Sequence, residues 1–245
     1  MAINAAMHDF DRSNAYLPLI REIPVLGDLS DEQARFIAGG GQLRNPSRGQ
    51  VLCEKGTPNT GLFCVLGGRV KLSAVSEDGA ERVLELMVPG RVFGQAAAVL
   101  DQPFPCLAQV LTESRVLHLG RERLREAISR WPAVAQMMLR LLARDCFRLM
   151  SDLEACCLMS ATERLVSFLL RDAEDLPGRP DAATLNLPAS KALVASSLNL
   201  TPETFSRELH ELARRGLVEV QRRTLQIPSL DALRGRLEAK GRKVA

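Results

Sequence analysis

Residues 190–216 read SKALVASSLNLTPETFSRELHELARRG. This stretch predicts two helices, 190–198 and 202–215, separated by a turn of three residues. Thr201 is a favourable N-cap, and Pro202 suits the first helical position because its φ is already fixed and it lacks a backbone donor. A helix, a short turn and a second helix with this opening form a helix-turn-helix. The C-terminal part of the chain therefore has the pattern of a module that reads DNA.

The second of these helices has one polar and one apolar face. Glu203, Ser206 and Arg207 recur at helical spacing on the polar face. Arginine can donate two hydrogen bonds to guanine O6 and N7, glutamate can accept from cytosine N4, and serine can reach a base or a phosphate. We predict that these three residues contact base edges in the major groove. An ordinary solvent-exposed helix face is the alternative, but the cap, the proline and the short turn together favour DNA reading.

The segment after the second helix supplies further candidate DNA contacts. Gly216 is expected to end the helix, and residues 217–220 and 224–227 predict a β-hairpin, or wing. Contacts to the sugar-phosphate backbone position a protein on DNA without reading sequence. We predict such contacts for Thr201, His210, Arg222 and Arg223. A basic tail adds Arg234, Arg236, Lys240, Arg242 and Lys243, and this local density says more about DNA than the formal net charge of +3.

The region from about residue 43 to residue 119 has a different pattern. Short runs of β-forming residues alternate with glycine-bearing turns such as Gly67-Gly68 and Asp78-Gly79. The predicted strands are 50–53, 61–66, 69–75, 81–87 and 109–111. Many short strands at this spacing predict a β-sandwich or a barrel.

A long helix is predicted after the β region. Residues 121–129 predict a short helix, and Trp131-Pro132 begins a longer one. One side of the longer helix repeats apolar residues with alternating spacings of three and four, as in a coiled coil. This seam consists of Leu139, Leu142, Cys146, Leu149, Leu153 and Cys156. A second apolar side includes Met138 and Leu141, so the helix needs two partners. The simplest pair is the β domain of the same chain and the same helix of a second subunit, which predicts a parallel homodimer.

Composition and motifs argue against several other classes of protein. The 245 residues suffice for two domains, and an aromatic content of 4% argues against a stacking platform for single-stranded nucleic acid. The six cysteines form no Cys-x-x-Cys pair, which predicts reduced thiols. Neither a signal-peptide pattern nor an apolar stretch of roughly 20 residues is present, so we expect a cytoplasmic protein without a membrane partner. The sequence has no metal-ligand pair, nucleophile elbow or P-loop, and we predict neither a metal site nor an enzyme.

This order of elements resembles the CRP/FNR family of transcription regulators over about residues 20–232. The segments that carry the resemblance are Arg48-Gly49-Gln50-Val51-Leu52, Gly67-Gly68-Arg69-Val70-Lys71-Leu72, Pro89-Gly90-Arg91-Val92-Phe93-Gly94 and Leu200-Thr201-Pro202-Glu203-Thr204-Phe205-Ser206-Arg207. The resemblance implies an α+β fold with a cyclic-nucleotide-binding-like β-roll, a long dimerisation helix and a C-terminal winged helix-turn-helix. It also implies double-stranded DNA and RNA polymerase as partners.

The resemblance sets the expected domain organisation. The regions are an N-terminal tail with a short helix at 1–30, a β-roll sensory domain at 31–129, a dimerisation helix at 130–158, and a winged helix-turn-helix with a basic tail at 159–245. Ser30 to Gln33 forms a capping box that predicts a helix start. Within the last region, residues 160–170 predict an amphipathic helix, 175–183 a polar loop and 185–187 a short strand.

The resemblance also implies a DNA target. Glu203-x-x-Ser206-Arg207 matches the FNR-type recognition pattern, whose palindrome is close to TTGAT, four bases, ATCAA. By that carry-over Arg207 reads the guanine, Glu203 the opposing cytosine and Ser206 a thymine. A two-fold dimer requires half-sites about one helical turn apart.

The sequence argues against two signals that family members use. FNR holds an iron–sulfur cluster with clustered N-terminal cysteines, whereas the first cysteine here is Cys53. Cyclic-nucleotide binders have a glutamate after the glycine of the phosphate cassette and an arginine about ten residues later. Here Gln95 follows Gly94, and residues 103–106 at the expected arginine contain no cation, so a cyclic phosphate would lack a charge-assisted anchor.

The effector therefore stays open at this point. Dnr-like members, which respond to nitric oxide, bind haem between the β-roll and the dimerisation helix, and here His8, His118 or His210 would have to supply the imidazole. A thiol sensor at Cys106, Cys146 or Cys156 is another alternative, although the sequence gives none of them a visible low-pKa environment. The candidate effector pocket consists of Gly94, Gln95, Cys106 and His118.

Two functional classes compete. The leading hypothesis is a homodimeric transcription regulator in which a signal in the β-roll changes the angle of the paired helices and so the spacing of the two reading helices. The second is an enzyme or small-molecule-binding protein whose helix-turn-helix is incidental. DNA affinity at low salt would distinguish them.

Overall fold

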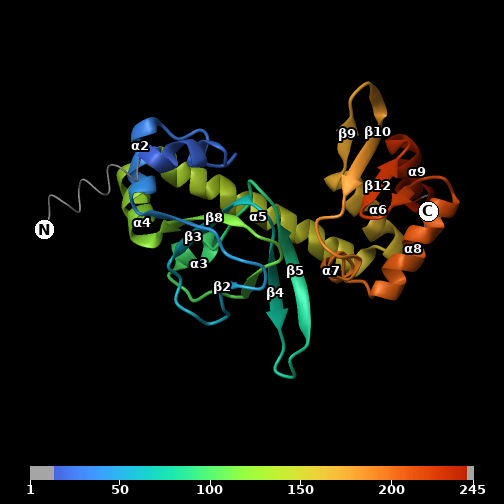
Figure 1. Cartoon of the computed structure of the whole chain (residues 1–245), viewed down its shortest axis with the longest axis horizontal. Coiled ribbons are helices and arrows are strands. Elements are labelled where there is room, and N and C mark those ends of the chain that lie inside the picture. The colour runs from blue at the N-terminus through green and yellow to red at the C-terminus, as the bar shows by residue number, and fades with distance from the viewer. Residues whose placement is uncertain (1–13, 242–245) are drawn as a thin grey trace, which may run out of the picture. The chain divides into compact units, whose positions relative to one another are not determined.

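The computed structural model describes residues 14–241, with side chains up to residue 237, and divides the chain into two compact units (Figure 1). The first unit extends to Arg148 and the second begins at Leu149. The boundary falls within the long helix α5 (Pro132–Leu158), so both units contain part of it. Within residues 14–241, no helical stretch combines the length and hydrophobicity that crossing a bilayer requires.

The first unit is a β-roll of two antiparallel four-stranded sheets. Its elements are α2 (Asp31–Gly39), β1 (Gly41–Arg44), β2 (Val51–Cys53), β3 (Gly61–Gly67), β4 (Val70–Val75), β5 (Glu81–Met87), β6 (Val92–Phe93), α3 (Gln95–Leu100), β7 (Leu107–Val110), β8 (Arg115–Gly120), α4 (Arg121–Arg130) and the first part of α5. One sheet has the order β1-β8-β3-β6 and the other β2-β7-β4-β5. The predicted strands are therefore confirmed to within about two residues. The sandwich or barrel that the sequence predicts is a β-roll.

Two glycines allow the strands of the β-roll to approach each other closely. Gly61 has a φ of +147°, and a Cβ atom there would lie 2.0 Å from the Leu119 carbonyl oxygen. Gly94 has a φ of +89°, and a Cβ atom there would lie 2.8 Å from the Gly61 carbonyl oxygen. Only glycine fits both the left-handed backbone and the short separation.

The first hydrophobic core includes residues from the region predicted to be an N-terminal tail with a short helix. Residues 14–21 are helical, and Ile20, Ile23 and Leu26 are at most 1% exposed in a core shared with α2, α4 and α5. The prolines at 18 and 24 interrupt the helical periodicity without removing the apolar side chains from the core. The predicted capping box is confirmed, since Ser30 and Gln33 exchange hydrogen bonds at the start of α2.

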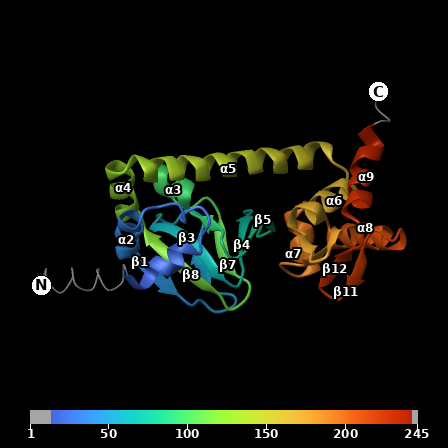
Figure 2. The ribbon, with the colours of Figure 1, turned by 90° about the horizontal axis from the view of Figure 1, so that it is seen from above.

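Helix α5 packs against the β-roll along one side of its first part. Val134, Met137, Met138 and Leu141 are buried there, as the second apolar side predicted. The short helix α3, which the sequence analysis did not predict, lies beside this part of α5 (Figure 2).

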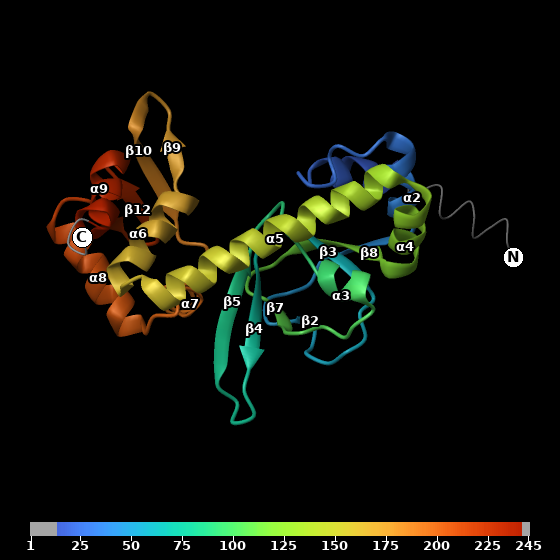
Figure 3. The same cartoon turned by 180° about the vertical axis from the view of Figure 1, so that it is seen from behind.

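The second unit is a winged helix-turn-helix. It contains the end of α5, α6 (Ala161–Asp172), β9 (Glu174–Leu176), β10 (Arg179–Asn186), α7 (Lys191–Ser197), α8 (Pro202–Arg214), β11 (Glu219–Gln221), β12 (Thr224–Ile227) and α9 (Leu230–Gly241). The strands form one antiparallel sheet in the order β11-β12-β10-β9, of which Figure 3 labels β12, β10 and β9. Helices α6 and α8 bury their apolar faces in this unit.

One prediction for this unit was wrong, and another was confirmed in large part. Residues 175–183 belong to the β9–β10 hairpin and are not a polar loop, whereas the predicted strand 185–187 coincides with the end of β10. Gly178 provides the positive φ of +75° at the tip, and the pairing register shifts between Arg179 and Ala183, where Pro180 cannot donate a ladder hydrogen bond.

The expected basic tail is largely helical. Residues 230–241 form α9, whose Leu230 and Leu233 are buried. Basic residues dominate the composition of this segment and its apolar pattern is weak, which is why composition alone predicts a tail. The side chain of Lys240, and all of Arg242 and Lys243, lie outside the described residues.

Candidate nucleic-acid interface

Local hydrogen bonds build the helix-turn-helix as the sequence predicted. Ser190 caps α7, and the Thr201 hydroxyl caps α8 by accepting from the Thr204 backbone N–H at 3.2 Å. Pro202 occupies the first turn of α8. Asn199, in the turn, has a φ of +55°, a left-handed conformation that asparagine adopts more readily than most residues. Gly216, with a φ of +70°, follows the end of α8.

Helix α8 has an apolar, buried face and a polar face on the opposite side. Phe205, Leu209 and Leu212 are at most 1% exposed and fix the helix to the core of the second unit. Glu203 and Arg207 are exposed and Ser206 is half-buried, with all three on the side of α8 away from that core. Burial of the apolar face therefore determines which side chains remain available to DNA.

Glu203 is held as a carboxylate at the start of α8. A hydrogen bond from its own backbone N–H, with a second from Thr201, lowers the pKa of Glu203. The ionised group is an acceptor only, which is the form that a cytosine amino group requires.

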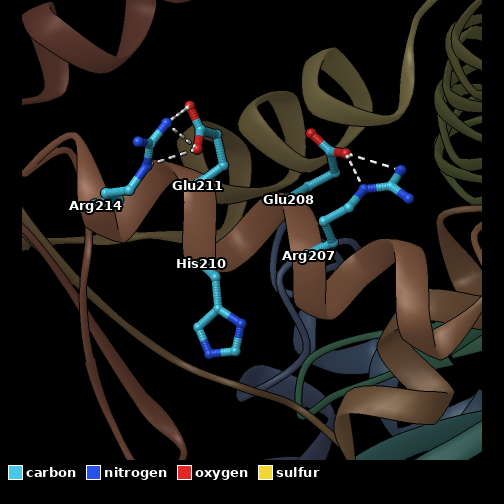
Figure 4. Close-up of a pocket in the computed structure, with 5 residues that line it drawn as sticks. All are labelled: Arg207, Glu208, His210, Glu211 and Arg214. Atoms are coloured by element: carbon cyan, nitrogen blue, oxygen red, sulfur yellow. Dashed lines mark hydrogen bonds and ion pairs between the residues drawn. The ribbon is translucent and has the colours of Figure 1, made fainter.

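Arg207 is an exposed residue that pairs with its neighbour on α8. Its side chain is 71% exposed, and its guanidinium group contacts the Glu208 carboxylate at 3.1 Å. Both residues line a shallow surface concavity along α8 together with His210, Glu211 and Arg214 (Figure 4). His210 points away from the two arginine–glutamate pairs in this view. Arg214 and Arg215 both pair with Glu211, so part of the basic density near α8 is neutralised within the helix.

The predicted backbone contacts lie on exposed segments. Arg222 and Arg223 occupy the turn between β11 and β12, where Arg222 has a φ of +56°. The Arg223 guanidinium donates to the Leu187 carbonyl oxygen at 3.2 Å. Thr201 and His210 are exposed at the start and in the second half of α8. The residues predicted to contact bases or the sugar-phosphate backbone therefore lie on α8, at its N-cap and in the wing, while α6 and α7 pack against α8.

The residues of the predicted effector pocket have separate partners. Gly94 begins α3 and accepts a hydrogen bond from the Asn59 side chain at 3.2 Å. Gln95 is 8% exposed and donates through its Nε2 to the Asp145 carboxylate of α5, while its Oε1 atom is buried without a hydrogen-bond partner. Cys106 is half-buried before β7.

A charged network extends from Asp145. Arg148 pairs with both Asp145 and Glu85 of β5, and Arg91 pairs with Glu85 at 2.6 Å. The side chains of Glu85 and Asp145 are only 16% and 21% exposed, so these groups face the protein more than the solvent. The network connects α3 and β5 to α5 within the first unit.

His118 is part of the β-roll interior. Its ring lies 4.7 Å from the Phe63 ring between centroids, and its Nε2 atom is 3.0 Å from the Thr60 hydroxyl oxygen. Burial, with the nearby Arg44 charge, lowers the pKa of His118 to about 4. The imidazole is therefore neutral at physiological pH and already hydrogen-bonded.

Comparison with known proteins identifies both units. Residues 43–130 match the model of the cyclic nucleotide-binding domain, and residues 163–236 match that of the Crp-like helix-turn-helix domain. The chain belongs to the CRP/FNR family. It is thus a transcription regulator with a DNA-binding helix-turn-helix, and not an enzyme.

Several CRP/FNR relatives match most of the chain. The anaerobic regulatory protein of Pasteurella multocida is 28% identical over 190 residues, which cover 76% of this chain and 68% of that protein. The CRP-like cAMP-activated global transcriptional regulator of Mycobacterium tuberculosis is 26% identical over 76% of this chain and 84% of its own. The transcriptional activator protein anr of Pseudomonas aeruginosa is 25% identical over 74% of each chain.

Solved structures support the fold. FixK2 from Bradyrhizobium japonicum superposes with a TM-score of 0.72 at 21% identity, covering 80% of this chain and 96% of that one. A CooA variant from Carboxydothermus hydrogenoformans gives a TM-score of 0.70 at 20% identity, covering 87% and 94%.

The pocket residues of this CRP/FNR regulator do not fit a cyclic nucleotide. The Gln95 amide group is engaged by Asp145, and the nearby arginines Arg91 and Arg148 are paired with carboxylates. A cyclic phosphate placed here would meet the charges of Asp145 and Glu85 without an unpaired cation to offset them.

His118 and three cysteines of the first unit bear on a haem or thiol sensor in this CRP/FNR regulator. The Nε2 atom of His118 lies 3.0 Å from the Thr60 hydroxyl oxygen, so a haem iron at this nitrogen would have to displace that hydrogen bond, and His8 lies outside the described residues. Burial raises the pKa of Cys53 and Cys64 to about 12 and also raises that of Cys106, opposite to what a reactive thiolate needs. Among residues 14–241 no three histidine, cysteine or acidic side chains gather in a metal-binding arrangement.

Proposed function

We propose that this regulator binds as a homodimer to a palindrome close to TTGAT, four bases, ATCAA. The observation that carries the proposal is the exposed face of α8, where Glu203, Ser206 and Arg207 stand in the FNR-type pattern. Arg207 would donate to guanine O6 and N7, Glu203 would accept from the opposing cytosine, and Ser206 would contact a thymine. Thr201, His210, Arg222 and Arg223 would contact the sugar-phosphate backbone.

The exposed side of α5 supports dimerisation through that helix. Leu139, Leu149 and Leu153 of the predicted seam are each more than 60% exposed, Cys146 and Cys156 are exposed, and Leu142 is half-buried. Phe147 and Met150, which lie outside the seam, are 73% and 61% exposed and widen the apolar surface. An apolar surface of this kind on a soluble regulator indicates an interface. The second copy would bury it as a parallel coiled coil.

The contacts between the β-roll and α5 support a signal sensed in the first unit. Gln95, at the start of α3, and Glu85, in β5, bind Asp145 and Arg148 of the dimerisation helix. An effector that displaced either contact would move α5 and, in the dimer, change the spacing of the two copies of α8. RNA polymerase would be the partner that reads this change.

The proposal is tested by titrating DNA duplexes with the full-length protein in gel-shift and footprinting experiments. The duplexes carry the palindrome or a version with each half-site G·C pair changed to A·T. We expect the intact palindrome to bind roughly 5- to 150-fold more tightly per half-site, the range of a bidentate arginine–guanine contact. Arg207→Ala should remove this preference.

Arg35→Ala is the matched control, since it removes one exposed positive charge from α2 in the first unit. It should leave the preference for the palindrome unchanged. If Arg207→Ala also leaves the affinity and the preference unchanged, the assignment of α8 as the reading helix is wrong.

A further inference from the structure

The Glu208 side chain of α8 contacts both the adjacent Arg207 and a residue of another helix, α6. Its side chain is 15% exposed, whereas that of the adjacent Arg207 is 71% exposed. The Oε1 atom of Glu208 accepts from Arg207 Nε at 3.2 Å and from Arg207 Nη2 at 3.1 Å. The Oε2 atom accepts from the Thr162 hydroxyl of α6 at 2.7 Å. The carboxylate therefore bridges the supporting helix and the exposed arginine (Figure 4 shows the Arg207–Glu208 part).

This contact leaves one particular edge of the guanidinium group free. Arginine has five N–H donors in a planar fork. Glu208 takes the Nε proton and one Nη2 proton, so the end of the fork keeps both Nη1 protons and the second Nη2 proton. Two parallel donors from that end match guanine O6 and N7. Glu208 thus binds the side of the guanidinium group that guanine does not need.

The Thr162 hydroxyl fixes the carboxylate from the other side. Thr162 lies in the first turn of α6, two residues after Ser160, whose capping box with Glu163 determines where that helix begins. Without the hydroxyl, rotation about the Glu208 side chain would let the carboxylate follow the mobile arginine into solvent. When the hydroxyl holds the carboxylate, the Arg207 guanidinium group is ordered before DNA binds. The Arg207 side chain therefore loses less conformational freedom on binding.

The other arginine–glutamate cluster of α8 provides a contrast. Glu211 pairs with Arg214 and Arg215, but its side chain is twice as exposed as that of Glu208, at 30%. Its arginine partners lie three and four residues along the same helix, which is the ordinary spacing of a surface ion pair.

We propose that Glu208, held by Thr162, is a positioning residue that presents the Nη edge of Arg207 to guanine and so sharpens sequence discrimination. This inference rests on the proposed role of Arg207. Because the carboxylate also repels phosphates, Glu208 should lower the affinity for all DNA while raising the preference for the correct site.

The test measures a ratio of affinities by fluorescence anisotropy with the full-length protein. The two duplexes are the palindrome and its version with A·T at both guanine positions. Glu208→Gln and Thr162→Val are compared with Glu211→Gln, which removes the same charge from the same helix but does not touch Arg207. We expect the first two variants to reduce the ratio roughly fivefold to tenfold, part of the discrimination of a bidentate contact. Glu211→Gln should keep the ratio, while both glutamate variants should bind random DNA more tightly.

The affinity ratios of these variants distinguish a failure of the positioning role of Glu208 from a failure of the proposed function. If the ratio is unchanged in Glu208→Gln and in Thr162→Val while Arg207→Ala abolishes it, Glu208 has no positioning role and the proposed function stands. If Arg207→Ala leaves the ratio intact, the proposed function itself fails. A merely structural role would lower the melting temperature and weaken binding to both duplexes alike, and an equal drop of the ratio in Glu211→Gln would also overturn the inference.

Discussion

Protonation of a single residue, His118, should make the stability of the β-roll depend on pH. Its pKa is about 4 in the folded protein and 6.5 as an ordinary histidine. Below pH 6.5 the unfolded chain binds the proton and the folded chain does not, so stability is lost as pH falls towards 4. At about 1.4 kcal/mol per pKa unit, the loss amounts to about 3 kcal/mol. Urea denaturation at pH values between 7 and 4 measures this loss of unfolding free energy.

His118→Gln is the comparison for this experiment. Glutamine can keep a hydrogen bond to Thr60 but does not titrate, so the unfolding free energy of the wild-type protein should fall by about 3 kcal/mol relative to that of the variant as pH falls from 6.5 to 4. A constant difference across that range would contradict the assigned pKa shift. Carboxylates with lowered pKa, such as Glu81, act in both proteins and cancel in the comparison.

Single residues whose role depends on nearby sequence could be predicted. The Thr201 cap, Pro202 and the exposed positions of Glu203 and Arg207 follow from the periodicity and capping of one helix. The Thr162–Glu208 hydrogen bond could not be predicted, because its partners are 46 residues apart and meet only when α6 packs against α8. The Asp145 partner of Gln95 was missed for the same reason, with 50 residues between them.

The capping box of α6 makes a prediction at the scale of an element. Ser160 accepts from the Glu163 backbone N–H, and the Glu163 carboxylate accepts from the Ser160 backbone N–H at 2.6 Å. Ser160→Ala should lower the unfolding free energy of the second unit by about 1 kcal/mol, because an orphan donor at the helix start loses its partner. Urea denaturation followed by circular dichroism measures the change.

Ser151→Ala is the matched control for the cap. Ser151 is an exposed residue inside α5, where alanine is at least as good a helix former as serine. This variant should be as stable as the wild-type protein or slightly more so. Equal stabilities for Ser160→Ala and Ser151→Ala would show that the cap contributes nothing.

Elements with strong local signals were predictable, and those that depend on packing were not. Helices α2, α6, α7 and α8 begin at recognisable caps. The sequence of the β9–β10 hairpin predicts a loop because its proline and glycine residues are typical of loops, whereas pairing of β10 with β12 makes it part of a sheet. Helix α3 lacks a side-chain cap, and α9 is capped by Ser229, which accepts from the Ala232 backbone N–H at 3.0 Å, but has no clear amphipathic periodicity. Burial of Ala97, Ala98 and Leu233 fixes these two helices in the fold.

The proposed dimer gives a testable prediction for the whole molecule. Leu153→Glu places a charge in the proposed seam, opposite its own copy, and should convert the dimer to monomers that bind a full palindrome poorly. Leu100→Glu is the control, since Leu100 is 67% exposed on α3 and Leu153 is 64% exposed on α5. Light scattering gives the molar mass, and gel shifts give the affinity. A dimeric Leu153→Glu protein with normal DNA binding would rule out this seam.

The sequence by itself determined the family architecture and which face of α8 is exposed. Both rest on features that neighbouring residues establish, namely strand and helix periodicity, turn glycines and the cap at Thr201. Only the tertiary structure decided that His118 is a buried neutral histidine, that Gln95 binds Asp145, and that Glu208 stands behind Arg207. The physical reason is that burial and hydrogen-bond partners depend on which distant segments pack together, and a one-dimensional pattern does not contain those contacts.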